Sequence, residues 1–323
     1  MLRFIFTPED LARVRLAPGP DPLWETRLAA HLVHRLDGAQ FFARWRQKVR
    51  AGLPPEALAY LALVPPAGDP PDFLTPGPPG TDFAAGAEEV LHTPPGRVRA
   101  EVAAMTGGRR VPDRVLDLGN GSVPAMHGLW SSMRAFHEHA VLPVWPRVRR
   151  AVDADRSART QVIAAAGVQA MLSSIHPSAR WSDGILTVES RGVDRAVHLG
   201  GRGLTVVPSF FGCRRPVTRA DPALDPVLVV PVARELLRLD PSPDQEGALV
   251  ALLGRTRAGA LRELARSRTT TALAQRMDIS PASASEHASV LRKAGLVASQ
   301  REGRHVVHVL TDLGRGLLER SMP

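Results

Sequence analysis

The stretch DISPASASEHASVLRKAGLV, from Asp278 to Val297, decides how the C-terminal part of the chain folds. Ser280 is a preferred helix N-cap, and Pro281 suits the first helical position because no N–H is needed there. Gly295 ends the pattern, since glycine readily takes the left-handed backbone that closes a helix. Three apolar residues at i, i+4, i+7 spacing form one stripe: Ala284, Ala288 and Leu291. We therefore predict a helix over residues 281–294 that buries this stripe.

The segments on either side predict further short elements. Helical patterns cover three preceding segments: residues 245–253, 256–266 and 270–277. Downstream, two alternating segments joined by a Gly-containing turn predict a β-hairpin within residues 296–310, and a final helix is expected at about 312–320. The order helix, helix, turn, helix, hairpin is that of a winged helix-turn-helix domain, in which the second motif helix enters the DNA major groove.

The segment from Thr269 to Thr311 resembles the DNA-binding half of ArsR-type winged helix-turn-helix regulators. The residues that carry the resemblance are Leu273-Ala274, Ser280, Ser283, Ser285, His287, Val290-Leu291-Arg292, Ala294-Gly295-Leu296-Val297 and the turn from Arg301 to Arg304. LGRTRAGALREL, at Leu253 to Leu264, resembles the first helix of that family, and EDLARVRLAPGPDPLWE, at Glu9 to Glu25, is similar to larger actinobacterial members with an extended N-terminal region. The resemblance implies a regulator that binds operator DNA and represses transcription. A homodimer is expected because one recognition helix reads few base pairs and two half-sites supply specificity.

The outward face of the predicted helix 281–294 and the hairpin, or wing, at 299–308 supply the candidate DNA contacts. Small polar residues at the helix start and bases at its end suit close approach to a groove. The candidates are Ser280, Ala282, Ser283, Ser285, Glu286, His287, Arg292, Arg301, Arg304 and His305. Glu286 departs from the family pattern, because a carboxylate weakens binding near phosphates unless it accepts a hydrogen bond from a cytosine amine. Residues 269–277 contain no cysteine, which excludes thiolate metal sensing there.

Composition places the chain among globular proteins with a basic surface. Its 323 residues carry a formal net charge of +9, and residues 245–323 hold 12 Arg and Lys against 7 Asp and Glu, a net charge of +5. Such an excess suits phosphate partners. The single Cys213 excludes an internal disulfide framework. No apolar stretch reaches the length of a membrane span and no signal-peptide core is evident, so we expect a cytoplasmic protein with no membrane partner.

The sequence pattern of residues 1–240 predicts a mixed α/β region in which helices dominate up to about residue 180. A short strand is expected at Arg3 to Phe6, and a helix then begins at Thr7-Pro8, which supply an N-cap and a first helical position. The long helical pattern that follows is expected to break at residues 142–146, which contain two prolines, and again near Gly167.

Four short β-branched runs between residues 184 and 232 predict a small antiparallel sheet. The two prolines in residues 241–244 predict a linker. The whole chain is thus predicted to be α+β and mainly helical, with a regulatory and dimerisation region at 1–240 and a winged helix-turn-helix domain at 245–323.

Two other functions compete with DNA binding. VLDLGNGSVP, from Val115 to Pro124, resembles the first motif of S-adenosylmethionine-dependent methyltransferases, in which a strand and a Gly-rich turn approach the cofactor. Pro124 stands near a position where a further glycine is expected, and no run of alternating strands and helices follows, so we favour a loop here. A winged-helix module that binds another protein is the third hypothesis. We expect no enzymatic reaction and no cofactor.

Histidine and aromatic residues of the N-terminal region offer weaker signals. His127, His137 and His139 are expected on the surface, and His137 and His139 do not share a helix face, which argues against a metal site. Four aromatic residues are expected to mark a core: Trp130, Phe136, Trp145 and Trp181. An apolar pocket lined by these rings would suit a small apolar effector.

Overall fold

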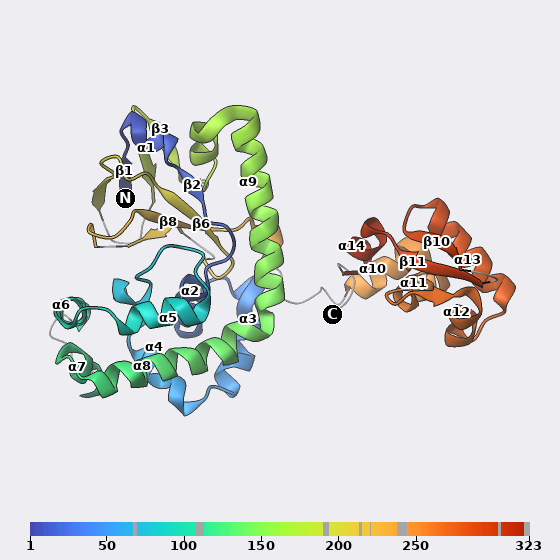
Figure 1. The fold of residues 1–323 in the computed structure, drawn as a ribbon, viewed down its shortest axis with the longest axis horizontal. Helices are drawn as coiled ribbons and strands as arrows, with labels where there is room; N and C mark the ends of the chain where they lie inside the picture. Colours follow the sequence, from blue (N-terminus) through green and yellow to red (C-terminus); the bar gives the residue numbers. More distant parts are fainter. Residues whose placement is uncertain are drawn as a thin grey trace. The chain divides into compact units, whose positions relative to one another are not determined.

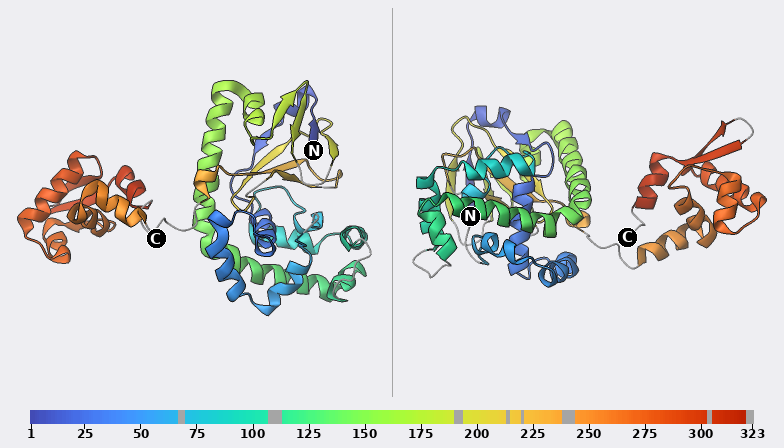
Figure 2. Two further views of the ribbon diagram at one scale, coloured as in Figure 1. Left: turned by 180° about the vertical axis from the view of Figure 1, so that it is seen from behind. Right: turned by 60° about the horizontal axis from the view of Figure 1, so that its bottom comes forward.

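A computed structural model describes residues 1–66, 70–106, 113–189, 194–212, 215–219, 221–237, 244–302 and 305–319. The chain divides into two compact α+β units, Met1–Leu239 and Asp240–Pro323 (Figures 1 and 2). Cys213, Arg304 and residues 241–243 of the expected linker lie outside the described residues. Among the described residues, no helix is long and apolar enough to span a membrane.

The helical part of the N-terminal unit begins as the sequence predicts. The first helix, α1 (Pro8–Ala12), is capped by Thr7, and the carboxylate of Asp10 accepts a hydrogen bond from the Thr7 backbone N–H in return. The helices that follow are α2 (Pro22–His34), α3 (Ala39–Ala51), α4 (Leu58–Ala62), α5 (Phe83–Leu91), α6 (Pro95–Thr106), α7 (Asp113–Gly119) and α8 (Val123–Phe136). Their apolar faces pack into one core with Trp24, Phe42 and Phe136 at its centre.

A long helical path leads from this core towards the sheets. Helix α8 continues through a π-helical turn, η3 (His137–Val141), and a 3₁₀ turn, η4 (Leu142–Val144), into α9 (Trp145–Ser173). Gly167 has φ 84° and ψ 174°, so the α9 helix is interrupted there. Both predicted breaks are confirmed. The first lies where Pro143 and Pro146 remove helical N–H donors, and the second lies where glycine alone tolerates the backbone.

Two four-stranded mixed sheets complete this unit. Their strands are β1 (Leu2–Ile5), β2 (Arg15–Leu16), β3 (Arg180–Ser182), β4 (Ile185–Val188), β5 (Arg195–His198), β6 (Thr205–Ser209), β7 (Val217–Thr218) and β8 (Val227–Pro231). The strand orders are β3-β4-β1-β5 and β2-β6-β8-β7. Strands β1 and β5 pair in parallel, as do β2 with β6 and β6 with β8. The remaining pairs, β1 with β4, β3 with β4 and β7 with β8, are antiparallel.

The expectation of one small antiparallel sheet over residues 184–232 is therefore wrong. The N-terminal strands β1 and β2 join the later strands, which creates two sheets and three parallel pairings. The almost continuously apolar sequences of β6 and β8 could have indicated parallel pairing. Strands of parallel sheets are usually covered on both faces, and such strands are apolar along their whole length. Four of the five residues in each of these strands are buried.

Strands β6 and β8 separate two apolar cores. Val207 and Val229 belong to the core of the helical part. Val206 and Leu228, the neighbouring residues, belong to a second core with Phe4 of β1 and residues at the end of α9. Successive side chains of a strand point to opposite faces, so one sheet forms a wall of both cores.

The expected surface position of His137 is wrong. His137 is buried rather than on the surface: its ring stacks on Phe83 at 3.9 Å between centroids, and its Nδ1 lies 2.7 Å from Thr26 Oγ1. Burial lowers the pKa of His137 to about 4. The four aromatic residues pack against apolar cores, as expected, but against two different ones: Trp130, Phe136 and Trp145 belong to the first core and Trp181 to the second, so they do not line one pocket together.

The Val115 to Pro124 segment also differs from both interpretations of its sequence. Residues Asp113–Gly119 form α7, where a loop was favoured and where a methyltransferase motif would require a strand. A turn containing Gly121, with φ 78°, follows, and Ser122 then caps α8 by accepting a hydrogen bond from the Ala125 N–H. The strand and Gly-rich turn of a nucleotide-binding motif are therefore not formed by this segment.

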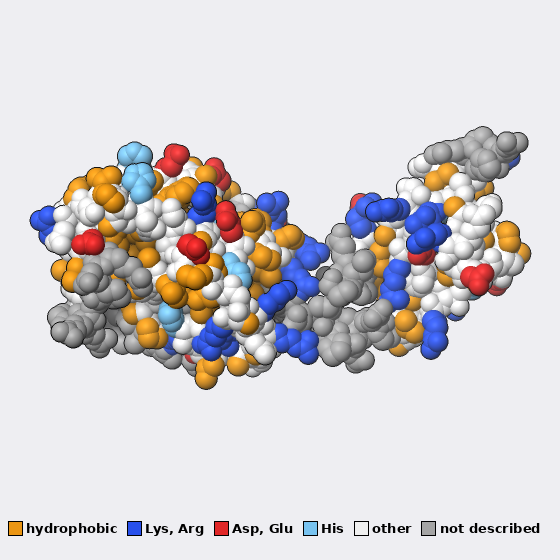
Figure 3. Space-filling view, turned by 90° about the horizontal axis from the view of Figure 1, so that it is seen from below, with side chains coloured by type: hydrophobic (Ala, Val, Ile, Leu, Met, Phe, Trp, Pro, Cys, Tyr) orange, Lys and Arg blue, Asp and Glu red, His pale blue; other side chains and the backbone are white. Residues whose placement is uncertain are grey.

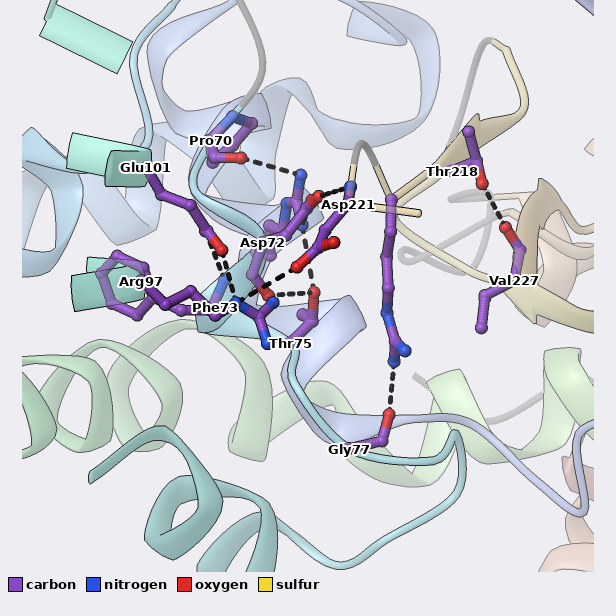
Figure 4. A network of polar contacts seen from close by, with 12 residues as sticks. Pro70, Asp72, Phe73, Thr75, Gly77, Arg97, Glu101, Thr218, Asp221 and Val227 are labelled. Atoms are coloured by element: carbon purple, nitrogen blue, oxygen red, sulfur yellow. Dashed lines mark hydrogen bonds and ion pairs between the residues drawn. The ribbon is translucent and has the colours of Figure 1, made fainter. Parts of the chain in front are cut away.

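The irregular segment before α5 is fixed by buried charges, as Figure 4 shows. The Arg27 guanidinium lies 3.5 Å from Asp72 and donates to Thr75 Oγ1 at 3.0 Å. Asp72 also accepts a hydrogen bond from the backbone N–H of Asp221 at 2.8 Å, while Arg97 contacts Asp221 at 3.4 Å. These contacts attach the segment to α2 and to the chain that follows β7, and the Phe73 N–H attaches it to α6 by donating to the Glu101 carboxylate at 2.8 Å.

The C-terminal unit contains α10 (Asp244–Leu253), α11 (Arg255–Glu263), β9 (Arg268–Thr269), α12 (Thr270–Met277), α13 (Pro281–Lys293), β10 (Val297–Glu302), β11 (His305–Leu310) and α14 (Asp312–Glu319). Strands β10 and β11 form an antiparallel hairpin, and β9 pairs with the outer side of β11. Helices α11, α12 and α13 pack around one apolar core with Leu261, Leu273 and Leu291 fully buried.

Candidate nucleic-acid interface

A short turn joins α12 to α13 and sets the angle between them. Thr269 caps α12 by accepting a hydrogen bond from the Ala272 N–H at 3.2 Å. The helix ends at Asp278, whose φ of 52° lies in the left-handed region that aspartate tolerates better than most residues. The Ile279 N–H donates to the Ala274 carbonyl at 3.1 Å, which closes the end of the helix.

Helix α13 has the predicted ends and the predicted buried stripe. Ser280 caps it, because its Oγ accepts a hydrogen bond from the Ser283 N–H at 3.1 Å. Gly295 has φ 73°, and the Leu296 N–H donates to the Leu291 carbonyl at 2.9 Å. The three stripe residues Ala284, Ala288 and Leu291 are at most 1% exposed. The packing of this helix was therefore correctly predicted.

The opposite face of α13 is directed to solvent. Ser280, Ala282, Ser285, Glu286 and Arg292 are exposed, while Ser283 and His287 are half-buried. The Ser283 hydroxyl lies 2.9 Å from Ser280 Oγ, so both hydroxyls already take part in the cap. Within the described part of the chain, Ser285, Glu286 and His287 have no side-chain hydrogen bond or ion pair. The polar groups of these three side chains are thus not used to hold the unit together.

The wing carries a further cation. Arg301 is exposed and lies opposite Val306 in the hairpin. His305 begins β11, but its side chain and the whole of Arg304 lie outside the described residues. Of the three candidate wing contacts, the structure thus places only the Arg301 side chain.

Not every arginine of this unit is equally available to an anion. Glu263 lies 3.3 Å from the Arg268 guanidinium and 3.2 Å from that of Arg276, and its carbonyl oxygen also accepts a hydrogen bond from Arg268. Arg292 and Lys293, at the end of α13, have no ion pair among the described residues. On the face of the C-terminal unit seen in Figure 3, Arg and Lys side chains predominate over Asp and Glu.

His308 is a site residue that the sequence did not single out. Its side chain is 5% exposed, its Nδ1 lies 2.8 Å from Ser299 Oγ and its Nε2 lies 2.9 Å from Thr270 Oγ1. Burial lowers the pKa of His308, and the charge of Arg292 lowers it further. The signal that could have found it is the hairpin register, which places His308 opposite Ser299. That register depends on the turn length, which alternation alone does not define.

The described residues contain no group of three or more His, Cys, Asp or Glu side chains placed to hold a metal ion. Comparison with known proteins finds no matching family model and no curated relative of the chain. We therefore derive a function from the geometry of its residues.

Proposed function

We propose that the chain is a DNA-binding transcriptional regulator with a C-terminal winged helix-turn-helix domain. In this proposal α13 lies in the major groove and the β10–β11 wing contacts the backbone or the minor groove. No reaction is catalysed, and transcription is controlled by occupation of the operator. The resemblance of residues 269–311 to ArsR-type regulators favours repression.

One observation carries the proposal. Helix α13 buries Ala284, Ala288 and Leu291, while its other face carries small and polar side chains, of which Ser285, Glu286 and His287 make no hydrogen bond or ion pair within the described residues. Small residues at 282 and 285 allow the backbone to approach base edges, and Arg292 and Lys293 supply charge for phosphates. A polar outer face is common to surface helices. The feature that favours DNA binding is the combination, on one face, of side chains small enough to enter a groove with Arg292 and Lys293 at the helix end.

We further propose that the regulator acts as a homodimer. A single recognition helix reads few base pairs, and a two-fold pair of helices reads two half-sites one helical turn apart. The partner is double-stranded DNA, and the protein is proposed to act in the cytoplasm. An N-terminal effector site remains part of this proposal, although the aromatic residues first considered for it do not share a pocket.

The basic residues should set affinity without setting sequence preference. Arg301→Ala and Arg292→Ala are each expected to weaken binding to a random-sequence duplex about five-fold and to reduce the slope of log affinity against log salt by about 0.9, the value for one phosphate contact. Fluorescence anisotropy at several salt concentrations measures both quantities. Arg315→Ala, an exposed change on α14, is the control and should change neither. Binding that does not depend on salt would contradict the proposal.

The polar face of α13 should set sequence preference. Ser285→Ala and His287→Ala are expected to change the base preference at one or two positions, because each good base contact contributes about 1–3 kcal/mol of discrimination. Glu286→Gln should increase the affinity for random duplex, since it removes a negative charge from the interface. Selection of sites from a random duplex library measures the preference, and Ser267→Ala, exposed outside α13, is the control. Identical selected sites for all variants would favour a protein-binding role instead.

A further inference from the structure

His308 lies where the wing meets the helix pair. In β11 it is opposite Ser299 of β10 on one side and Arg268 of β9 on the other. Its two ring nitrogens contact one hydroxyl of the wing, on Ser299, and one hydroxyl of α12, on Thr270. A neutral imidazole has one N–H donor and one acceptor, and a hydroxyl can serve in either role, so both contacts are satisfied together.

Among the described residues of the hairpin, burial decreases from this contact towards the wing tip. Leu310 and His308 are buried, whereas Val306, Gln300 and Arg301 beyond them are exposed. The contact between Thr270 and His308 therefore gives the wing a buried side-chain anchor to α12, beside the backbone pairing of Val307 with Thr269. Beyond its pairing with β9 the wing has only two strands, and a two-stranded hairpin has little stability of its own, so the position of Arg301 depends on such anchors.

We infer that His308 is a positioning residue that fixes the wing to the first turn of α12, so that Arg301 and the exposed face of α13 meet one duplex together. This inference rests on the proposed DNA-binding function, since it assigns His308 a part in that interface. His308 is too deeply buried to touch DNA itself and acts through Thr270 and Ser299. The surrounding charges are Arg292 and the Arg268–Glu263 pair, and neither pair member contacts the imidazole nitrogens.

The test separates the contact of His308 with Thr270 of α12 from its contact with Ser299 within the hairpin. Thr270→Val is nearly isosteric and removes only the hydroxyl that reaches from α12 to His308. Ser299→Ala is the matched control, because it removes a hydrogen bond to the same ring without cutting the tie to α12. Each variant is combined with Arg301→Ala in the full chain, and affinity for a random-sequence duplex is measured by anisotropy.

Thr270→Val is expected to weaken duplex binding about five-fold, the factor typical of one ordinary hydrogen bond or phosphate contact. In the Thr270→Val background, Arg301→Ala should cause almost no further loss of duplex affinity, because the wing no longer places Arg301 against the duplex. In the Ser299→Ala background Arg301→Ala should keep its full effect. Equal losses from Arg301→Ala in both backgrounds would overturn the inference, since a purely structural role of Thr270 predicts independent effects.

A second measurement does not depend on DNA. Amide hydrogen exchange in the free chain should be faster in β10 and β11 of Thr270→Val than in Ser299→Ala, with similar melting temperatures for both variants. Unchanged exchange in Thr270→Val would overturn the role of His308 even if DNA binds. Failure of the wild-type chain to bind duplex would refute the proposed function, while exchange would still show whether the tie holds the wing.

Discussion

Replacement of Glu25 by alanine is expected to lower the free energy of unfolding of the N-terminal unit by about 4 kcal/mol. The Glu25 side chain is 1% exposed and accepts hydrogen bonds from the Ser209 hydroxyl and from the backbone N–H groups of Phe210 and Phe211, at 2.8 to 3.0 Å. Alanine leaves these three buried donors without their acceptor, and each such loss costs about 1–3 kcal/mol. Urea denaturation followed by tryptophan fluorescence measures the change.

The control for this prediction is Glu56→Ala, which removes an exposed glutamate and should change stability by less than about 0.5 kcal/mol. Equal stability of the two variants would show that Glu25 does not anchor residues 209–211. A variant too unstable to purify would be replaced by Glu25→Gln, which keeps one acceptor oxygen and should lose less stability.

The pH dependence of stability gives this prediction a second readout. Burial raises the pKa of Glu25 from 4.5 to about 7, although hydrogen bonds from Phe211, Phe210 and Ser209 oppose that shift. Because the pKa of Glu25 is higher in the folded than in the unfolded state, binding of a proton by Glu25 stabilises the fold. This stabilisation is fully present below pH 4.5 and is lost as the pH rises through about 7. Between pH 4.5 and 7.5, wild-type stability should fall by about 3 kcal/mol relative to Glu25→Gln, which cannot titrate.

The second large effect is expected at Gly314 in α14. A Cβ atom there would overlap the Leu296 carbonyl oxygen and lie 2.9 Å from its carbonyl carbon, and these are backbone atoms that no side-chain rotation can move. Gly314→Ala should therefore displace α14 from the start of β10 and lower the stability of the C-terminal unit by about 3 kcal/mol. Thermal unfolding of the full chain followed by circular dichroism measures this loss.

Gly316 provides a control on the same helix. A Cβ at Gly316 meets no atom within 4 Å, so Gly316→Ala should raise stability by about 0.5–1 kcal/mol through helix propensity alone. If Gly314→Ala were as stable as Gly316→Ala, the close packing of α14 on Leu296 would be wrong. Stability changes of opposite sign for these two Gly→Ala substitutions would support it.

The sequence predicts most closely those features that depend on neighbouring residues. The ends of α13 follow from Ser280, Pro281 and Gly295, and its buried stripe follows from spacing, so this helix was predicted to within about a residue. The interruption at Gly167 was found for the same reason. Local signals that agree with one another define an element without knowledge of the rest of the chain.

Features that depend on distant pairing were missed. The insertion of β1 between β4 and β5 joins residues at least 180 positions apart, and no local pattern specifies that partner. The irregular segment near Asp72 has no period, and its conformation depends on charges contributed by α2 and by the chain after β7. The role of His308 likewise requires the register of β10 against β11. These features are determined by tertiary contacts, through burial and long-range hydrogen bonds.

The sheet that contains β6 and β8 has a consequence for how the N-terminal unit unfolds. Val207 and Val206 are adjacent, yet they contribute to different cores. If one core opened alone, strands β6 and β8 would lose the packing on one of their two faces and would expose that apolar face to water. The two cores are therefore coupled through a single layer of backbone. We expect them to melt in one cooperative transition, so that a defect on either side of that layer lowers the stability of the whole unit.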